Sequence, residues 1–177
     1  MIYFAKDIGK SPSDIVTISE ITISTLKEDS GDIAKEDFLA RVDLISTMGQ
    51  KVLITNYPQY YKLASYVAKM GVPHLGLVLG IYNFQQIFTE EYANVEGGIL
   101  AALGQLFRDF VKVYIYPYKS EKGDVESLCN LTVPKEYDHL FSHLKGMKQI
   151  DDVVGFEKDI LHIYSSKVLQ MIVSHVS

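Results

Sequence analysis

The chain has 177 residues, of which 47% are hydrophobic and 22% charged, and this composition is that of a globular protein with one full core. The net charge is −5 and Arg41 and Arg108 are its two arginines, which argues against a nucleic-acid partner because such proteins carry a basic stripe. No apolar run approaches the roughly 20 residues of a membrane span, and the single cysteine, Cys129, excludes an internal disulfide and fits a cytoplasmic location.

The first third of the chain predicts a strand followed by a helix. The β-branched run at 15–18 predicts the strand, while the pattern over 19–27 fits either a strand or a helix and is left open. A helix is expected over 35–48, because Glu36 lies near its positive end and Gly49 follows its last turn.

Three short apolar runs in the centre of the chain predict buried strands at 52–55, 75–79 and 111–116. Amphipathic helices are expected between them. The first helix follows Asn56, a good N-cap, and ends at Gly71.

Two further helices are expected between the second and third strands. Asn83 is expected to cap a short helix, and Gly97 and Gly98 precede the strongest helical stripe in the chain. That stripe predicts that Leu103, Leu106 and Phe107 are buried. The members of the stripe are Ile99, Ala102, Leu103, Leu106, Phe107 and Phe110.

Strands that are apolar on both faces, alternating with helices, predict an α/β fold with a mostly parallel sheet. We therefore expect one domain over 1–177, with three layers, helices on both faces of the sheet, and a Rossmann-like arrangement. All three central strands are expected to run parallel in that one sheet.

The last third of the chain contains weaker signals. Residues 119–124 predict an exposed loop, and a helix is expected over 134–146. Residues 147–159 are interpreted as a connection, with a last strand at 160–164 and a last helix at 167–176.

Ligands of such folds bind beyond the carboxyl ends of the parallel strands, so we expect the site at that edge. The candidate residues follow a predicted strand or open a helix, and they offer amide, phenol or bare backbone groups. They are Asn56, Tyr57, Gly80, Tyr82, Asn83, Gly97, Gly98 and Tyr118. A polar, flat metabolite or nucleotide suits this set. The plainer interpretation is that the asparagines cap helices, the glycines turn the chain and the tyrosines pack in the core or an interface.

No catalytic constellation or cofactor motif is present, and we expect no bound metal. His139 and His143 have the i, i+4 spacing of two metal ligands, but Leu140 occupies the position where an HExxH motif has glutamate. Cys129 has leucines at 128 and 131, whereas a reactive thiol needs electropositive surroundings.

Three segments carry a resemblance to a known family: 51-KVLITNYPQYYKLASYVAKM-70, 77-LVLGIYNFQQIFTEEYANVEGGILAALGQLFRDFVKVYIYP-117 and 160-ILHIYSSKVLQMI-172. They resemble a bacterial family with an SNYxEYYRLxxYL segment and a GxxNLxxIFxExYYxxLxGGILEAxGRLF segment ending in LYVYP. Its members are labelled TonB-dependent receptor or nicotinate-nucleotide adenylyltransferase. They are longer, so the resemblance implies that this chain corresponds to their C-terminal part or is a short member.

The resemblance implies a nucleotide-binding domain related to nicotinate nucleotide metabolism. The chain departs from the adenylyltransferase HxGH motif at 74–77, which reads His-Leu-Gly-Leu. It also has Ala101 and Gln105 where the family pattern has an acidic and a basic residue. A second hypothesis is a non-catalytic assembly domain that forms a homo-oligomer through a tyrosine-rich surface, since nine of the 12 tyrosines fall between 57 and 118.

Overall fold

The computed structural model describes residues 2–23, 33–89, 92, 94–108, 110–120 and 123–156. The strand expected at 160–164 and the helix expected at 167–176 lie outside these residues. Backbone contacts divide the described chain into two compact units. The first unit holds the residues up to Leu75 together with Leu103–Arg108, and the second holds Gly76–Ala102 and the described residues beyond Arg108.

The first unit begins with two short helical segments, α1 (Ile2–Asp7) and η1 (Pro12–Asp14). Ser11 caps η1, because its side chain accepts a hydrogen bond from the Ser13 N–H while its own N–H donates to the Asp14 carboxylate. Pro12 suits the first position of such a turn, where no N–H is needed.

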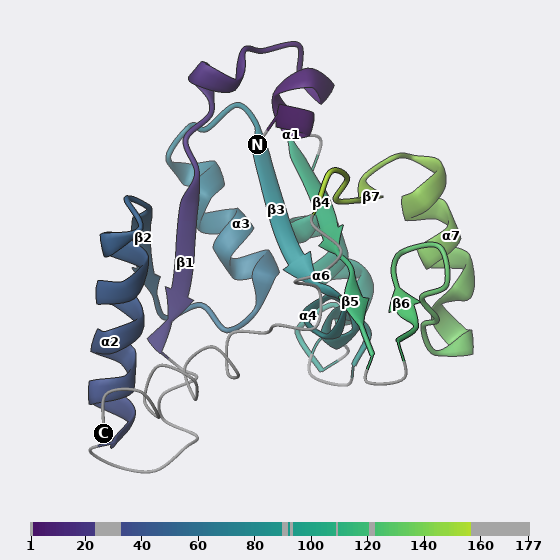
Figure 1. Cartoon of the computed structure of the whole chain (residues 1–177). Helices are drawn as coiled ribbons and strands as arrows, with labels where there is room; N and C mark the ends of the chain where they lie inside the picture. The colour runs from purple at the N-terminus through teal and green to yellow at the C-terminus, as the bar shows by residue number, and fades with distance from the viewer. Residues whose placement is uncertain are drawn as a thin grey trace. The chain divides into compact units, whose positions relative to one another are not determined.

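The sheet of the first unit consists of β1 (Ile18–Thr22) and β2 (Lys51–Thr55), which run parallel with Ile18 opposite Lys51 and Thr22 opposite Thr55 (Figure 1). Helix α2 (Ile33–Thr47) precedes β2, as predicted, and Gly49 takes a φ of 73° after it. The strand predicted at 15–18 is wrong in position. The η1 turn and its C-cap at Ile15 occupy the start of that run, and the observed strand lies mainly in the segment left open.

Helix α3 (Tyr60–Lys69) follows β2 and buries Tyr61, Leu63 and Ala64, and Gly71 follows it with a φ of 70° as predicted. The prediction that Asn56 caps α3 is wrong, since Gln59 is the N-cap. A proline disfavours the helical conformation at the residue before it, so Pro58 keeps Tyr57 out of the helix and moves the helix start forward.

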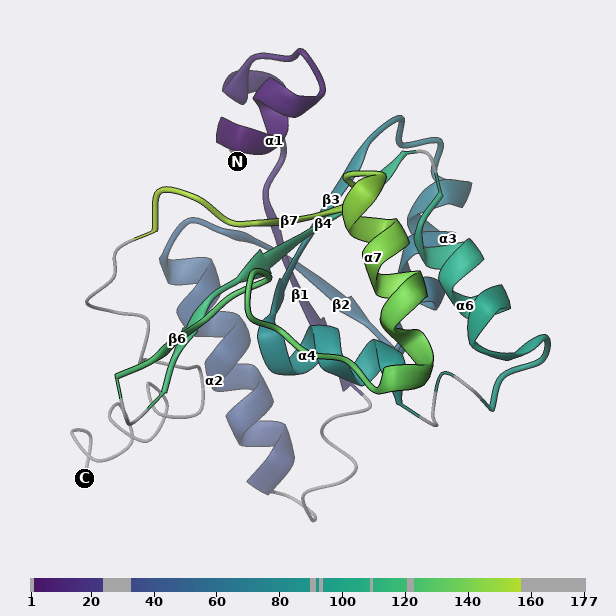
Figure 2. The same cartoon turned by 90° about the vertical axis from the view of Figure 1, so that its right-hand side faces the viewer.

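The second unit contains a three-stranded sheet in the order β3 (Leu75–Gly80), β4 (Val111–Tyr116) and β7 (Ile150–Asp152). The strands run parallel, with Val113 opposite Ile150 (Figure 2). The central strand β4 is buried on both faces, as its continuous apolar run predicts. Strand β7 falls in the stretch 147–159 that was predicted to be a connection. Its Ile-Asp-Asp sequence is too short and polar to show a strand pattern.

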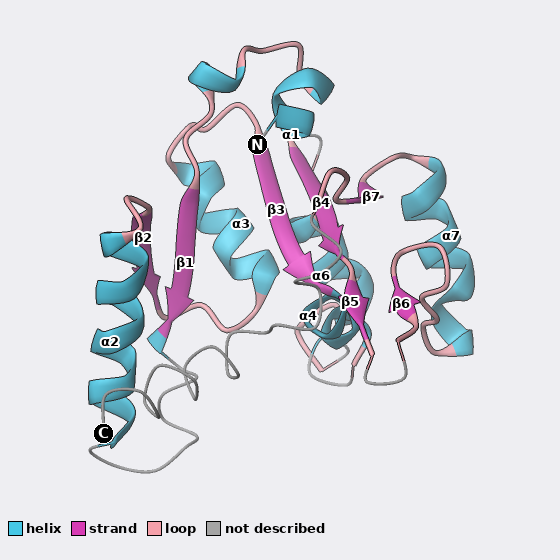
Figure 3. Cartoon of the chain, viewed as in Figure 1, coloured by secondary structure: helices cyan, strands magenta, loops and turns pink. Residues whose placement is uncertain are grey.

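The fold is therefore α/β with parallel sheets (Figure 3). The prediction that 52–55 shares a sheet with 75–79 and 111–116 is not met by the described hydrogen bonds, because β2 pairs with β1 in a separate two-stranded sheet. The sequence pattern did not resolve β1, so it could not identify this partner of β2.

The helices of the second unit surround an aromatic core. Helix α4 (Ile81–Gln85) continues into η3 (Gln86–Phe88), and η4 (Lys135–Tyr137) leads into α7 (Asp138–Gly146). The ring of Phe84 lies 5.5 Å from that of Phe88, and Phe141 on α7 lies 6.1 Å from each. These contacts join α7 to α4 and η3.

Helix α6 (Gly98–Leu106) follows the two predicted glycines. Leu103, Leu106 and Phe107 are buried, which confirms the predicted apolar stripe. Beyond β4, the segments β5 (Tyr118–Lys119) and β6 (Val125–Glu126) pair antiparallel, so the predicted loop at 119–124 begins one residue later than expected.

None of the helices in the part of the chain that the structure describes combines the length and apolarity needed to cross a bilayer.

Candidate functional site

The carboxyl ends of β3 and β4 bring two of the predicted residues together. Gly80 ends β3, and Tyr82 follows it on α4, while Tyr116 ends β4 and Tyr118 follows in β5. The ring centroids of Tyr82 and Tyr118 lie 5.3 Å apart with an interplanar angle of 62°, which is an edge-to-face contact. Tyr82 is 57% exposed. These two residues, called the tyrosine pair below, form an accessible aromatic surface at the strand ends.

Asn83 and Gly80 lie beside the tyrosine pair, in roles that differ from the prediction. Asn83 is the third residue of α4, and Gly80 is the N-cap, so the prediction that Asn83 caps the helix is wrong. The reason is that α4 begins directly after β3, with no linker in which Asn83 could precede the helix. Asn83 is exposed, next to Tyr82 in the same short helix.

Gly97 and Gly98 are explained by backbone geometry. Their φ angles are 83° and 69°, a conformation that favours glycine. A Cβ atom on Gly97 would lie 2.7 Å from the Cβ of Ala101. The N–H of Gly98 donates to the carbonyl of Val95 at 2.8 Å, so this group already has an intramolecular partner. An anion at this helix start would have to compete with that hydrogen bond.

Asn56 and Tyr57 follow β2 in the first unit. The N–H of Tyr57 donates to the Thr55 hydroxyl at 3.3 Å, and its ring lies 5.4 Å from that of Tyr66. Asn56 is exposed. The other six predicted site residues belong to the second unit. The convergence of all eight on one cleft therefore stays a prediction.

Sequence reasoning missed a carboxyl–hydroxyl pair at the end of the first sheet. Glu20 on β1 accepts a hydrogen bond of 2.5 Å from the Thr55 hydroxyl on β2, and Thr55 is only 6% exposed. Burial raises the pKa of Glu20, and the hydrogen bond from Thr55 opposes this effect. The pKa of Tyr60 is also raised, first by burial and then by the charge of Glu20. Glu20, Thr55 and Tyr60 are called the Glu20 cluster below.

The parallel register of β1 and β2 creates this cluster. Glu20 lies opposite Leu53, and Thr55 is two residues further along β2, so both side chains project on the same face of the sheet. Only the pairing of the two strands reveals this proximity. The pattern over 19–27 fits a strand as well as a helix, so the sequence does not place the side chain of Glu20.

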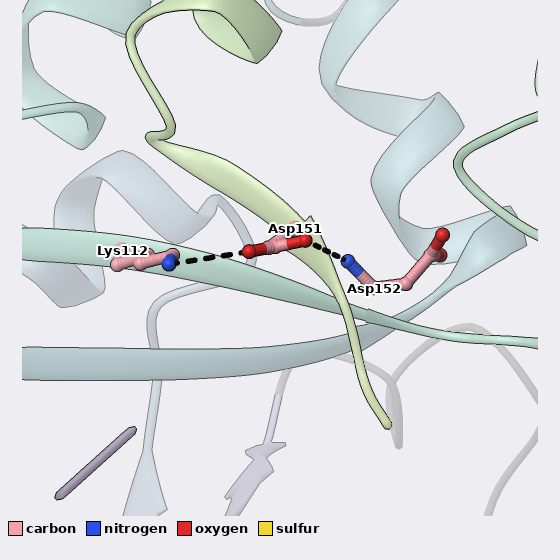
Figure 4. Close-up of polar contacts among 3 residues, drawn as sticks. All are labelled: Lys112, Asp151 and Asp152. Atoms are coloured by element: carbon pink, nitrogen blue, oxygen red, sulfur yellow. Dashed lines mark hydrogen bonds and ion pairs between the residues drawn. The ribbon is translucent and has the colours of Figure 1, made fainter. Parts of the chain in front are cut away.

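Two aspartates at the end of β7 point in different directions (Figure 4). Asp151 accepts from the Lys112 ammonium at 3.4 Å and from the Asp152 N–H at 3.0 Å. Asp152 accepts from the Leu128 N–H at 2.8 Å and from the Cys129 thiol at 3.8 Å. These bonds fix the 127–130 turn to the sheet. The group beside Cys129 is thus a carboxylate, the opposite of the electropositive setting that a nucleophilic cysteine needs.

The two histidines considered as metal ligands, His139 and His143, are both exposed on α7. Within the described residues, no three His, Cys, Asp or Glu side chains group closely enough to hold a metal ion.

The strand ends thus carry two groups that could contact a ligand, the tyrosine pair in the second unit and the Glu20 cluster in the first. No protein-family model, curated protein or solved structure matches this chain.

Proposed function

We propose that the chain is a small-molecule-binding α/β protein that takes a flat, polar metabolite of the nucleotide class at the carboxyl edge of its three-stranded sheet. The tyrosine pair is the observation that carries this proposal. Its rings follow two adjacent parallel strands, at the edge where α/β folds bind ligands. An exposed aromatic ring stacks on the face of a base or pyridine ring.

Polar groups next to the tyrosine pair support the same ligand class. The phenol groups both donate and accept hydrogen bonds, and the exposed amide of Asn83 can bond the polar edge of a base. None of these groups carries a fixed charge, so they favour a ring with mixed donors and acceptors over a simple ion.

The family resemblance narrows the proposed ligand to a pyridine nucleotide, in keeping with nicotinate nucleotide metabolism. A three-layer, Rossmann-like arrangement belongs to the same proposal and is supported by parallel strands alternating with helices. A cytoplasmic location is supported by the single cysteine.

Isothermal titration calorimetry of the full chain with nicotinate mononucleotide and with AMP tests the proposal. We expect saturable binding that Tyr82→Ala weakens by about 5- to 150-fold, since stacking on one ring contributes about 1–3 kcal/mol. Tyr82→Phe keeps the ring and should retain most of the affinity. Leu100→Ala is the control, because Leu100 is 68% exposed in the same unit and is not one of the candidate site residues. The absence of saturable binding, or equal binding by Tyr82→Ala, would contradict the proposal.

An assembly domain is the second candidate, and it has an observation of its own. Val78 is 61% exposed although it lies within β3, a terminal strand in the described three-stranded sheet. Exposed apolar strand surface is typical of an interface. Sedimentation velocity over a range of protein concentrations distinguishes the candidates: ligand-independent self-association supports assembly, and a monomer at all concentrations contradicts it.

A further inference from the structure

The carboxyl end of the two-stranded sheet in the first unit has features of a second binding site. Glu20 comes from β1, Thr55 from the end of β2, and Tyr57 and Tyr60 from the segment that opens α3 (Figure 1). All four residues belong to the first unit. Glu20, Tyr57 and Tyr60 are each partly exposed, so solvent reaches all three residues.

The hydroxyl of Thr55 fixes the Glu20 carboxyl group in place. It donates to Glu20 Oε1 at 2.5 Å and accepts from the Tyr57 N–H at 3.3 Å, so its donor is committed to the carboxyl group. A carboxylate has about four acceptor positions, of which Thr55 uses one. Glu20 therefore has acceptor capacity left for a donor from outside the chain.

Two influences on the pKa of Glu20 come from the described residues: burial, which raises it, and the Thr55 hydrogen bond, which lowers it less. Neither is a positive charge. A ligand that brings a positive charge would therefore stabilise the ionised carboxylate, whereas an anionic ligand would be repelled.

Two aromatic residues, Tyr57 and Tyr60, accompany the carboxyl group of Glu20. The backbone of Tyr57 is bonded to Thr55, and its ring lies 5.4 Å from that of Tyr66 at an angle of 39°. Burial raises the pKa of the Tyr60 phenol, and the charge of Glu20 raises this pKa further. Aromatic faces attract ammonium groups, and a carboxylate next to such rings adds a counter-ion.

From these contacts we propose that Glu20, Thr55, Tyr57 and Tyr60 form a binding site for a small organic ammonium ion. Glu20 is the counter-ion, Thr55 orients it, and the tyrosine rings contact the alkyl groups on the nitrogen. This proposal involves other residues than the tyrosine pair and rests on other contacts, so either proposal can fail without the other.

Amide NMR spectra of the ¹⁵N-labelled full chain, titrated with tetramethylammonium chloride against sodium chloride of equal ionic strength, test the site. We expect saturable shifts in β1 and in the segment from Thr55 to Tyr60. No saturable shifts, or shifts confined to Tyr82 and Tyr118, would overturn the proposal. This mapping uses the unmodified protein and does not depend on the folding of a variant.

Variants then test the role of the carboxylate. Glu20→Gln keeps the acceptor oxygen for Thr55 and removes the charge, and we expect it to weaken tetramethylammonium binding at least about tenfold. Glu96→Gln removes an exposed glutamate from the second unit and should leave binding unchanged. Equal weakening by both variants would show general electrostatic attraction, and equal binding by Glu20→Gln and the parent chain would show that Glu20 is not the counter-ion. Either result overturns the proposal.

Discussion

At the scale of single residues, Thr55 is held by two hydrogen bonds, one to each side of its strand end. Among the described residues it is the one polar residue classed as buried. Its hydroxyl donates to Glu20 on β1 and accepts from the backbone N–H of Tyr57 beyond β2. A buried hydroxyl is tolerated because it is hydrogen-bonded on both sides. Thr55 thus ties strand pairing to the start of the following segment.

Thr55→Val tests this role. Valine has nearly the shape of threonine but leaves the Glu20 oxygen and the Tyr57 N–H without this partner, so we expect a loss of about 1–3 kcal/mol in the free energy of unfolding. Thr47→Val is the matched control, since the Thr47 hydroxyl donates to the Leu44 carbonyl on the exposed side of α2 and should change stability by no more than about 0.5 kcal/mol. Urea denaturation measures both. Similar small losses would show that the hydroxyl of Thr55 contributes little.

At the scale of elements, α6 shows how far periodicity determines burial. Leu106 is 0% exposed and Leu100, in the same helix, is 68% exposed. The two leucines lie six residues apart, so they project on different sides of a helix with 3.6 residues per turn. The same side chain in one helix therefore has two different environments.

Replacing each leucine with alanine separates burial from helix propensity. Leu106→Ala should lower the free energy of unfolding by about 2–5 kcal/mol, because it removes buried methyl groups and leaves a cavity. Leu100→Ala should change it by less than about 0.5 kcal/mol. Circular dichroism during urea unfolding gives both values, and equal effects would mean that the buried face of α6 is assigned wrongly.

Elements whose signal is local were predictable from the sequence. The apolar run of β4 and the stripe of α6 were found because burial on both faces or a 3.6-residue period is visible within one segment. The helix caps at Asn56 and Asn83 were wrong because chain geometry outside the capping residue, a proline in one case and a missing linker in the other, sets where each helix starts. Strand β7 carried no local pattern at all.

At the scale of the whole molecule, the candidate sites depend on which strands pair. The general rule for parallel sheets was enough to place Tyr82 and Tyr118 together, since both follow strands of one sheet. Glu20 and Thr55 are 35 positions apart, and only the register of β1 and β2 joins them. Long-range pairing of this kind is not encoded in any single segment.

The Glu20 cluster also makes the stability of the molecule depend on pH. Burial raises the pKa of Glu20 above its ordinary value of 4.5, so the folded state holds this proton more tightly than the unfolded state does. The stabilising contribution is therefore complete below about pH 4.5 and is lost as the pH rises through the raised folded pKa. Glu20→Gln cannot ionise, so its stability relative to the parent chain should increase as the pH rises above about 4.5 and through the raised folded pKa of Glu20. The pKa of Tyr60 is raised above 10.0, so its contribution has the same sign but is lost only in more alkaline solution, and this second step should persist in Glu20→Gln. Urea unfolding at several pH values measures both steps. A difference in stability between the two proteins that stays constant across the acidic range would show that Glu20 has the same pKa in the folded and unfolded states.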